Sequence, residues 1–80
     1  LAIAWQGEYG RALVEAMRRQ PREEALNNIG YIALLKKDYR AAISYFEQAL
    51  EASPRWYPRA ASNLERAKQE AAAAQSTASE

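Results

Sequence analysis

Apolar residues recur every three or four positions along most of the chain, which is the period of an α-helix. No segment alternates apolar and polar residues with period two, as a half-buried β-strand would. The pattern therefore predicts an all-α domain, ending in a polar tail, Gln75–Glu80, that is expected to fray. Glycine, proline and charged residues divide the pattern into five predicted helical segments: Leu1 to about Gln6, about Gly10 to Gln20, about Arg22 to Lys36, about Tyr39 to Ser53, and about Pro58 into the alanine-rich tail.

The segment from Arg22 to Lys36 is apolar on nearly every side. On a helical wheel of about 100° per residue, one arc is expected to pack against the rest of the fold: Ala25, Leu26, Ile29, Gly30, Ile32 and Ala33. The opposite arc consists of Glu24, Asn27, Asn28, Tyr31, Leu34 and Leu35. Because three of these six residues are large and apolar, the helix is expected to have partners on more than one side.

The composition excludes several classes of function. Lys and Arg nearly balance Asp and Glu, and the formal charge of +1 argues against a nucleic-acid binder, which normally carries a basic excess. The chain has no Cys and no His, which removes the commonest metal ligands and the commonest general base. No apolar run is long enough to span a bilayer. We therefore expect no cofactor and no membrane insertion by this segment.

The chain begins at Leu1 inside an apolar stretch, with no residue before it to cap a helix. We therefore expect it to be a fragment or a processed product of a longer protein. The residues upstream of Leu1 would be the most informative addition.

Two stretches repeat the same order of residues. GEYGRALVEA at Gly7–Ala16 and KDYRAAISYF at Lys37–Phe46 both place an acidic residue before a tyrosine, and an alanine before an aliphatic residue. The two tyrosines lie 30 residues apart. A repeat spacing of about 30–35 residues is typical of a helical solenoid.

The segment Glu23–Trp56 resembles one complete 34-residue unit of the tetratricopeptide repeat (TPR) family. The residues that carry this resemblance agree in register: Leu26, Ile29–Gly30, Asp38–Tyr39, Ala42, Phe46, Ala49 and Pro54. The resemblance implies an antiparallel helix-turn-helix TPR solenoid. Residues 1–22 would be a partial preceding repeat, the end of a first helix plus a shortened second helix, and residues 57–74 a capping helix or incomplete repeat before the tail at 75–80.

Gly30 costs a helix on the order of 1 kcal/mol relative to Ala. The resemblance places Gly30 on the side of its helix that faces the paired helix. The missing side chain there lets the two helices approach closely. In the last predicted helix, the residues SNLER (Ser62–Arg66) match NNIGY (Asn27–Tyr31). Glu65 therefore takes the place of Gly30. A further helix is not expected to pack there, which suits the end of an array. Trp56 and Tyr57 are expected to cover the last helix.

Members of the TPR family bind peptides or partner helices in a concave groove lined by the first helix of each repeat. The groove positions map here to Glu24, Asn27, Asn28, Tyr31, Leu34 and Leu35, with Arg59, Asn63 and Arg66 from the last helix. Asparagine amides can hydrogen-bond the backbone of an extended peptide without reading its sequence. Two alternatives stay open: the leucines pack under the preceding helix, and the arginines neutralise Glu65 and Glu70 rather than steer an acidic partner.

No nucleophile–base pair and no glycine-rich phosphate loop is present, so we expect no enzymatic activity. The leading hypothesis is a protein–protein interaction module, the C-terminal part of a longer TPR scaffold or adaptor. The order of its repeat and short closing helix resembles the ends of bacterial TPR proteins that serve secretion and pilus assembly. The alternative is a structural self-assembly element that dimerises or swaps domains through its incomplete N-terminal repeat.

Overall fold

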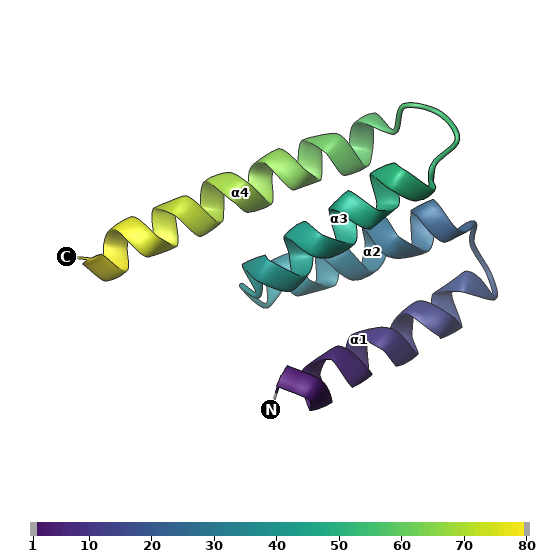
Figure 1. The fold of residues 1–80 in the computed structure, drawn as a ribbon, viewed down its shortest axis with the longest axis horizontal. Helices are drawn as coiled ribbons and strands as arrows, with labels where there is room; N and C mark the ends of the chain where they lie inside the picture. The colour runs from purple at the N-terminus through teal and green to yellow at the C-terminus, as the bar shows by residue number, and fades with distance from the viewer. Residues whose placement is uncertain (1, 80) are drawn as a thin grey trace.

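The computed structural model describes the backbone of residues 2–79 and the side chains of residues 8–75. The chain forms four helices, α1 (Ala2–Met17), α2 (Arg22–Leu35), α3 (Tyr39–Ala52) and α4 (Pro58–Ser79). Each helix runs antiparallel to the one before it, and α2 and α3 lie between α1 and α4 (Figure 1). The predicted all-α, antiparallel helix-turn-helix fold is confirmed.

Three of the predicted helices are found close to their expected bounds, but the N-terminal part is different. A single helix covers Ala2–Met17, so the predicted break between Gly7 and Gly10 is wrong. An interior glycine costs only about 1 kcal/mol, and continuing the helix satisfies backbone groups that a break would expose. At the other end, helical backbone continues to Ser79, through most of the tail expected to fray.

The turn between α2 and α3 is specified by hydrogen bonds on both sides. The Lys37 and Asp38 amides donate to the Leu34 and Ala33 carbonyls at 2.9 Å each, which closes the end of α2. Lys37 takes a left-handed φ of 65°, a conformation that glycine adopts at less cost. The Asp38 carboxylate then accepts from the Ala41 amide at 3.4 Å and caps the start of α3.

Gly30 is the closest contact point between α2 and α3. A Cβ atom built on Gly30 would lie 2.7 Å from Cδ1 and Cε1 of the Phe46 ring, which is fully buried. The expected packing role of Gly30 is therefore confirmed. Ala42 and Ala49, one turn to either side of Phe46, are fully buried on the same face of α3. Small residues around one large ring let the two helices pack along their whole length.

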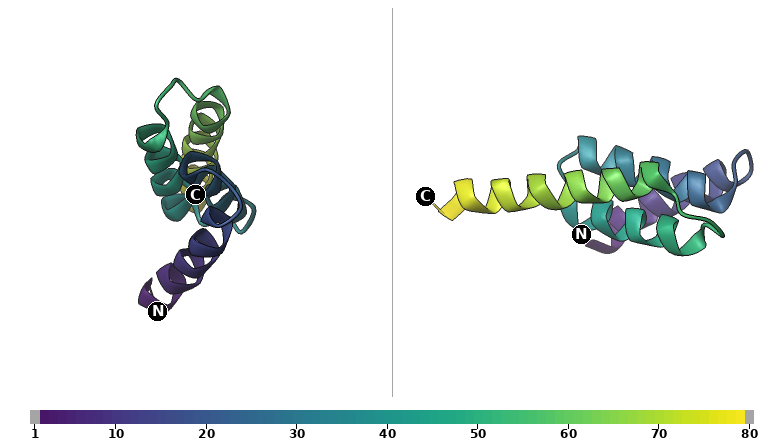
Figure 2. Two further views of the ribbon diagram at one scale, coloured as in Figure 1. Left: turned by 90° about the vertical axis from the view of Figure 1, so that its right-hand side faces the viewer. Right: turned by 90° about the horizontal axis from the view of Figure 1, so that it is seen from above.

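The outer helices complete the core in different ways. From α4, Ala60 and Ala67 are fully buried, and Leu64 packs beside them. From α1, Tyr9 is buried and meets the Tyr45 ring edge-on, with centroids 5.9 Å apart. Toward its N-terminus the α1 ribbon diverges from the other three helices, and α4 extends well beyond the start of α3 (Figure 2).

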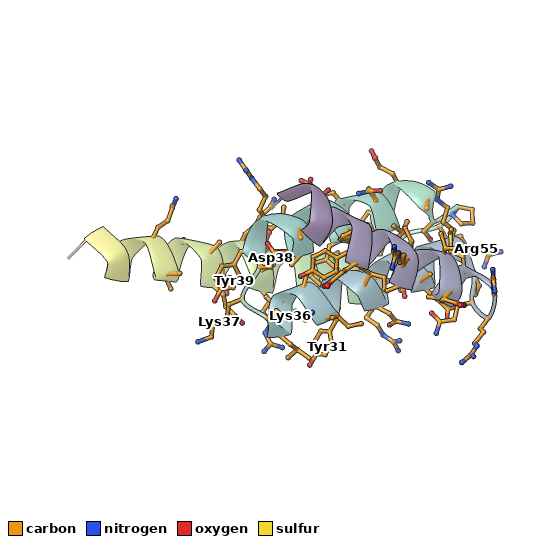
Figure 3. All side chains as sticks on the ribbon, turned by 90° about the horizontal axis from the view of Figure 1, so that it is seen from below. Tyr31, Lys36, Lys37, Asp38, Tyr39 and Arg55 are labelled. Atoms are coloured by element: carbon orange, nitrogen blue, oxygen red, sulfur yellow. The ribbon has the colours of Figure 1, made fainter. Side chains whose placement is uncertain are left out.

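The loop before α4 was expected to cover that helix with two aromatic residues, and only one of them does so. Tyr57 is half-buried and packs against Leu26, Ala49 and Ala60. Trp56 is 74% exposed, so its predicted covering role is wrong. Within this loop the Ser53 hydroxyl donates to the Arg55 carbonyl at 2.6 Å. Arg55 lies far from the Lys36–Tyr39 turn (Figure 3).

Candidate functional site

Four of the α2 residues predicted for the groove form one exposed line along the helix. This α2 stripe consists of Glu24, Asn28, Tyr31 and Leu35, at the i, i+4, i+7 and i+11 spacing that keeps side chains on one face. Tyr31 is 40% exposed and Leu35 is 62% exposed. Figure 3 shows Tyr31 extending away from the ribbon. All four residues of this line are exposed, whereas Asn27 and Leu34 between them are buried.

The predicted residues of α4 follow the same spacing. Arg59, Asn63 and Arg66 each stand 35 residues after their counterparts in α2, and Glu70 continues the line opposite Leu35. These four residues are the α4 stripe. Glu70 was missed by the prediction, although the same 35-residue offset would have found it.

One side-chain hydrogen bond and two electrostatic interactions link α2 with α4 along these stripes. Near the helix starts, burial raises the pKa of the half-buried Tyr57 phenol, while the charge of Arg59 lowers that pKa and the charge of Glu24 raises it. One turn further, the Asn63 amide donates to the Asn27 side-chain oxygen at 3.1 Å.

Arg66 interacts electrostatically with Tyr31 of α2. A hydrogen bond to Glu70 raises the pKa of the Arg66 guanidinium, and Tyr31 makes a smaller contribution of the same sign. We call the side of α2 and α4 that carries the two stripes the α2–α4 face.

Two predicted groove residues lie inside the protein instead. Asn27 is 3% exposed, and its side chain is used in the bond to Asn63. Leu34 is also 3% exposed and belongs to the core, so the packing interpretation holds for it and the groove interpretation does not. Ile32, predicted to pack inward, is 42% exposed instead. The buried arc of α2 is therefore rotated from the predicted one. Helix α2 contacts α1, α3 and α4, which confirms the expectation of partners on more than one side.

The exposed polar residues of the face are partly paired within the chain. The Arg66 guanidinium bonds the Glu70 carboxylate at 2.8 Å, which is the neutralising role set out above as an alternative to steering. The Asn28 amide donates to the Gln20 side-chain oxygen at 2.7 Å, a contact from the turn before α2 that the sequence pattern did not indicate. Glu24 and Arg59 are the other two charged residues of the two stripes. The two positive and two negative charges of the face therefore cancel.

The chemistry of the α2–α4 face suits contact rather than reaction. Tyr31, Leu35 and the adjacent Ile32 offer apolar area, while Asn28 offers amide donors and an acceptor. Among the described residues, no group of His, Cys, Asp or Glu could hold a metal ion. No helix in the described part of the chain is both long and apolar enough to cross a bilayer.

One buried titratable group lies outside this face, at the junction of α1 with α3. Burial, followed by a hydrogen bond to the Asp38 carboxylate, raises the pKa of the Tyr9 phenol to about 12. The Lys36 ammonium lies 5.7 Å from the centroid of the same ring. A phenol with so high a pKa keeps its proton at neutral pH, so Tyr9 is a structural residue rather than a base.

A separate hollow of about 800 Å³ opens between α3 and the projecting part of α4. Its walls include Tyr39, Ile43 and Ser44 from α3, and Ala71 and Ala74 from α4. None of the residues predicted for the groove lines it. The hollow follows from the length of α4, which continues past the first turn of α3 (Figure 1).

Comparison with known proteins identifies the central part of the chain. Residues 23–55 match the model of the tetratricopeptide repeat family. Neither the curated proteins nor the solved structures gave a significant match. The likeness to secretion and pilus-assembly proteins therefore stays an expectation. Helices α2 and α3 supply the two helices of the matched unit, and the repeat family is a non-catalytic module. The chain thus carries a tetratricopeptide repeat at residues 23–55.

Proposed function

We propose that this chain is a protein–protein interaction module that binds a peptide or partner helix along the α2–α4 face. The observation that carries the proposal is the pair of matching stripes. Four residues of α2 and four of α4 share one spacing at a constant offset of 35 residues, and the Asn63–Asn27 bond fixes their relative position. Two parallel rows of side chains on neighbouring helices present a ready surface for one elongated ligand.

The character of the exposed side chains limits the class of partner. The positive and negative charges of the face cancel, and Arg66 is already paired with Glu70. Affinity would therefore come from apolar contact with Tyr31 and Leu35 and from hydrogen bonds to Asn28. A large apolar side chain buried on such a surface contributes roughly 1.5–3 kcal/mol. The ligand would carry at least one such anchor beside a backbone amide that Asn28 can reach.

The outer face of α4 supports a terminal position in an array. Glu65 stands 35 residues after Gly30, and Glu65, Lys68 and Gln69 are all exposed. At the equivalent place on α2, glycine admits the Phe46 ring. A solvated polar face of this kind is what terminal repeats need for solubility. We propose that α4 closes a TPR scaffold or adaptor, as its capping helix.

The proposal is tested by selecting binders from a random peptide library and measuring their affinity for two variants. The double variant Asn28→Ala/Tyr31→Ala should weaken the selected peptides by at least about tenfold, since each residue contributes roughly 1 kcal/mol or more. The matched control is Ser44→Ala/Glu47→Ala, which changes two exposed residues of α3. Equal binding by parent and Asn28→Ala/Tyr31→Ala proteins would show that the groove assignment is wrong.

A further inference from the structure

The side chain of Asn28, a member of the α2 stripe, is held by a residue that lies outside the α2–α4 face. The Asn28 amide donates to the Gln20 side-chain oxygen at 2.7 Å. This is the one hydrogen bond that the Asn28 side chain makes to another described residue. Gln20 belongs to the turn that joins α1 to α2, so the contact connects this turn with the α2 stripe.

The backbone on both sides of Gln20 is fixed. The Gln20 amide donates to the Ala16 carbonyl at 2.9 Å, at the end of α1. The next residue, Pro21, has a ring that restricts its φ angle, and its carbonyl accepts from the Ala25 amide at 3.0 Å. Gln20 is also half-buried, whereas Asn28 is exposed. Gln20 is therefore the anchored member of the pair, and Asn28 is the member that it restrains.

The bond to Gln20 uses a small part of the hydrogen-bonding capacity of Asn28. A carboxamide has two N–H donors and an oxygen that accepts up to two hydrogen bonds. With one donor given to Gln20, Asn28 retains one donor and its oxygen. A residue of an extended peptide offers the complementary groups, one backbone C=O and one backbone N–H. A helical ligand does not, because its backbone groups bond one another along the helix.

The restraint on Asn28 has a consequence for affinity. Ordering a mobile side chain at the moment of binding opposes association, and a side chain that is ordered beforehand avoids this loss. Because Asn28 is exposed, its other neighbour would be water, which does not hold it in one rotamer. Gln20 therefore favours binding through Asn28 without contacting the ligand.

From these observations we infer that Gln20 is a positioning residue: it holds the Asn28 carboxamide so that the remaining N–H and the oxygen pair with the backbone of an extended peptide. The inference rests on the proposed function, because it specifies how Asn28 takes part in it. It also selects an extended peptide over a partner helix at this position of the face, and it gives the α1–α2 turn a part in binding.

The first test needs no ligand. In nuclear magnetic resonance spectra of the labelled 80-residue chain, the Asn28 side chain should populate one χ1 rotamer. Gln20→Met, which keeps the length of the side chain and removes its carboxamide, should produce an average over rotamers. The matched control is Gln48→Met, which removes an exposed glutamine that bonds Ser44 at 3.1 Å on α3. Rotamer averaging of Asn28 in the parent protein would overturn the inference.

The second test measures the affinity of the tightest-binding peptide from the random library. Gln20→Met should weaken this peptide at least about threefold, whereas Gln48→Met should not. Gln20→Glu should bind within about twofold of the parent, because a carboxylate still accepts from the Asn28 amide. In an Asn28→Ala background Gln20→Met should have no effect, a result that a merely structural role of Gln20 would not give. One N-methylated form of the peptide should lose affinity for the parent and none for Asn28→Ala.

Several binding results would overturn the inference. Tighter binding by Gln20→Met would show that Gln20 competes with the peptide, and unchanged binding would show that it takes no part. A peptide that becomes helical when bound would exclude the backbone pairing. If Asn28→Ala/Tyr31→Ala leaves peptide binding intact, the proposed function fails. If that variant weakens binding while Gln20→Met does not, the inference about Gln20 fails alone.

Discussion

Helices α1 and α3 match at three inward positions 30 residues apart, beginning with Tyr9 and Tyr39, but Phe46 of α3 corresponds to Ala16 of α1. In α3 the inner face is fully enclosed, with Ala42, Phe46 and Ala49 all at 0% exposure. In α1 only Tyr9 is buried among the described side chains, and Leu13 is half-buried. The difference shows that α3 is enclosed between α2 and α4, while α1 joins the core through fewer buried side chains.

The largest expected effect comes from removing the ring at the centre of that core. Phe46→Ala should lower the free energy of unfolding by about 3–5 kcal/mol, enough to unfold much of the chain at room temperature. Leu13→Ala, the comparison on α1, should cost about half as much because the side chain is only half-buried. Urea denaturation followed by circular dichroism measures both. A larger loss for Leu13→Ala would contradict the ranking of the two helices.

The two glycines provide a sharper test with the same chemical change. Gly30→Ala should destabilise the protein by about 1–3 kcal/mol, because the new methyl group would collide with the Phe46 ring. Gly10→Ala meets open space, so it should stabilise the protein by up to about 1 kcal/mol through helix propensity. Thermal melts of the two variants should shift in opposite directions. Shifts of the same sign would contradict the difference in packing that the structure shows at the two glycines.

The smallest effect concerns the tyrosine that attaches α1. Since folding raises the pKa of Tyr9 from 10.0 to about 12, the folded chain holds this proton at a higher pH than the unfolded chain. The resulting stabilisation is complete below pH 10 and is lost as the pH rises toward 12. Tyr9→Phe should cost about 1 kcal/mol at neutral pH through the lost hydrogen bond.

The same variant should also lose less stability between pH 10 and 12 than the parent does. Tyr45 keeps part of the dependence, because burial raises its pKa as well. Urea denaturation across this pH range provides the measurement. Identical pH profiles for parent and variant would mean that folding does not raise the pKa of Tyr9.

Much of the central repeat could be predicted from local chemistry. Gly30 indicates close packing, Asp38 caps a helix, and Pro58 favours a first helical turn. Each of these features can be predicted from a few neighbouring residues. The expected break at Gly7–Gly10 failed because glycine only weakens a helix and does not end one. Propensity alone could not decide between a turn and a continuous helix there.

The candidate site was predicted less completely, because burial depends on neighbours distant in sequence. Asn27 looks like an exposed amide until Asn63, 36 residues later, is brought against it. Ile32 is exposed and Leu34 is buried because α1, α3 and α4 together decide which sides of α2 are covered. A single helical wheel centres the buried arc on average hydrophobicity. It therefore cannot place a helix that has neighbours on several sides.

The central claim is that a ligand lies along the α2–α4 face, and amide chemical shifts test it most directly. A peptide selected from the random library would be titrated into isotopically labelled protein. The account predicts the largest shifts at Asn28, Tyr31, Leu35, Asn63 and Arg66, with little change at Ser44 and Glu47 of α3. Shifts concentrated around Val14 of α1, or in the hollow lined by Ile43 and Ala71, would contradict it.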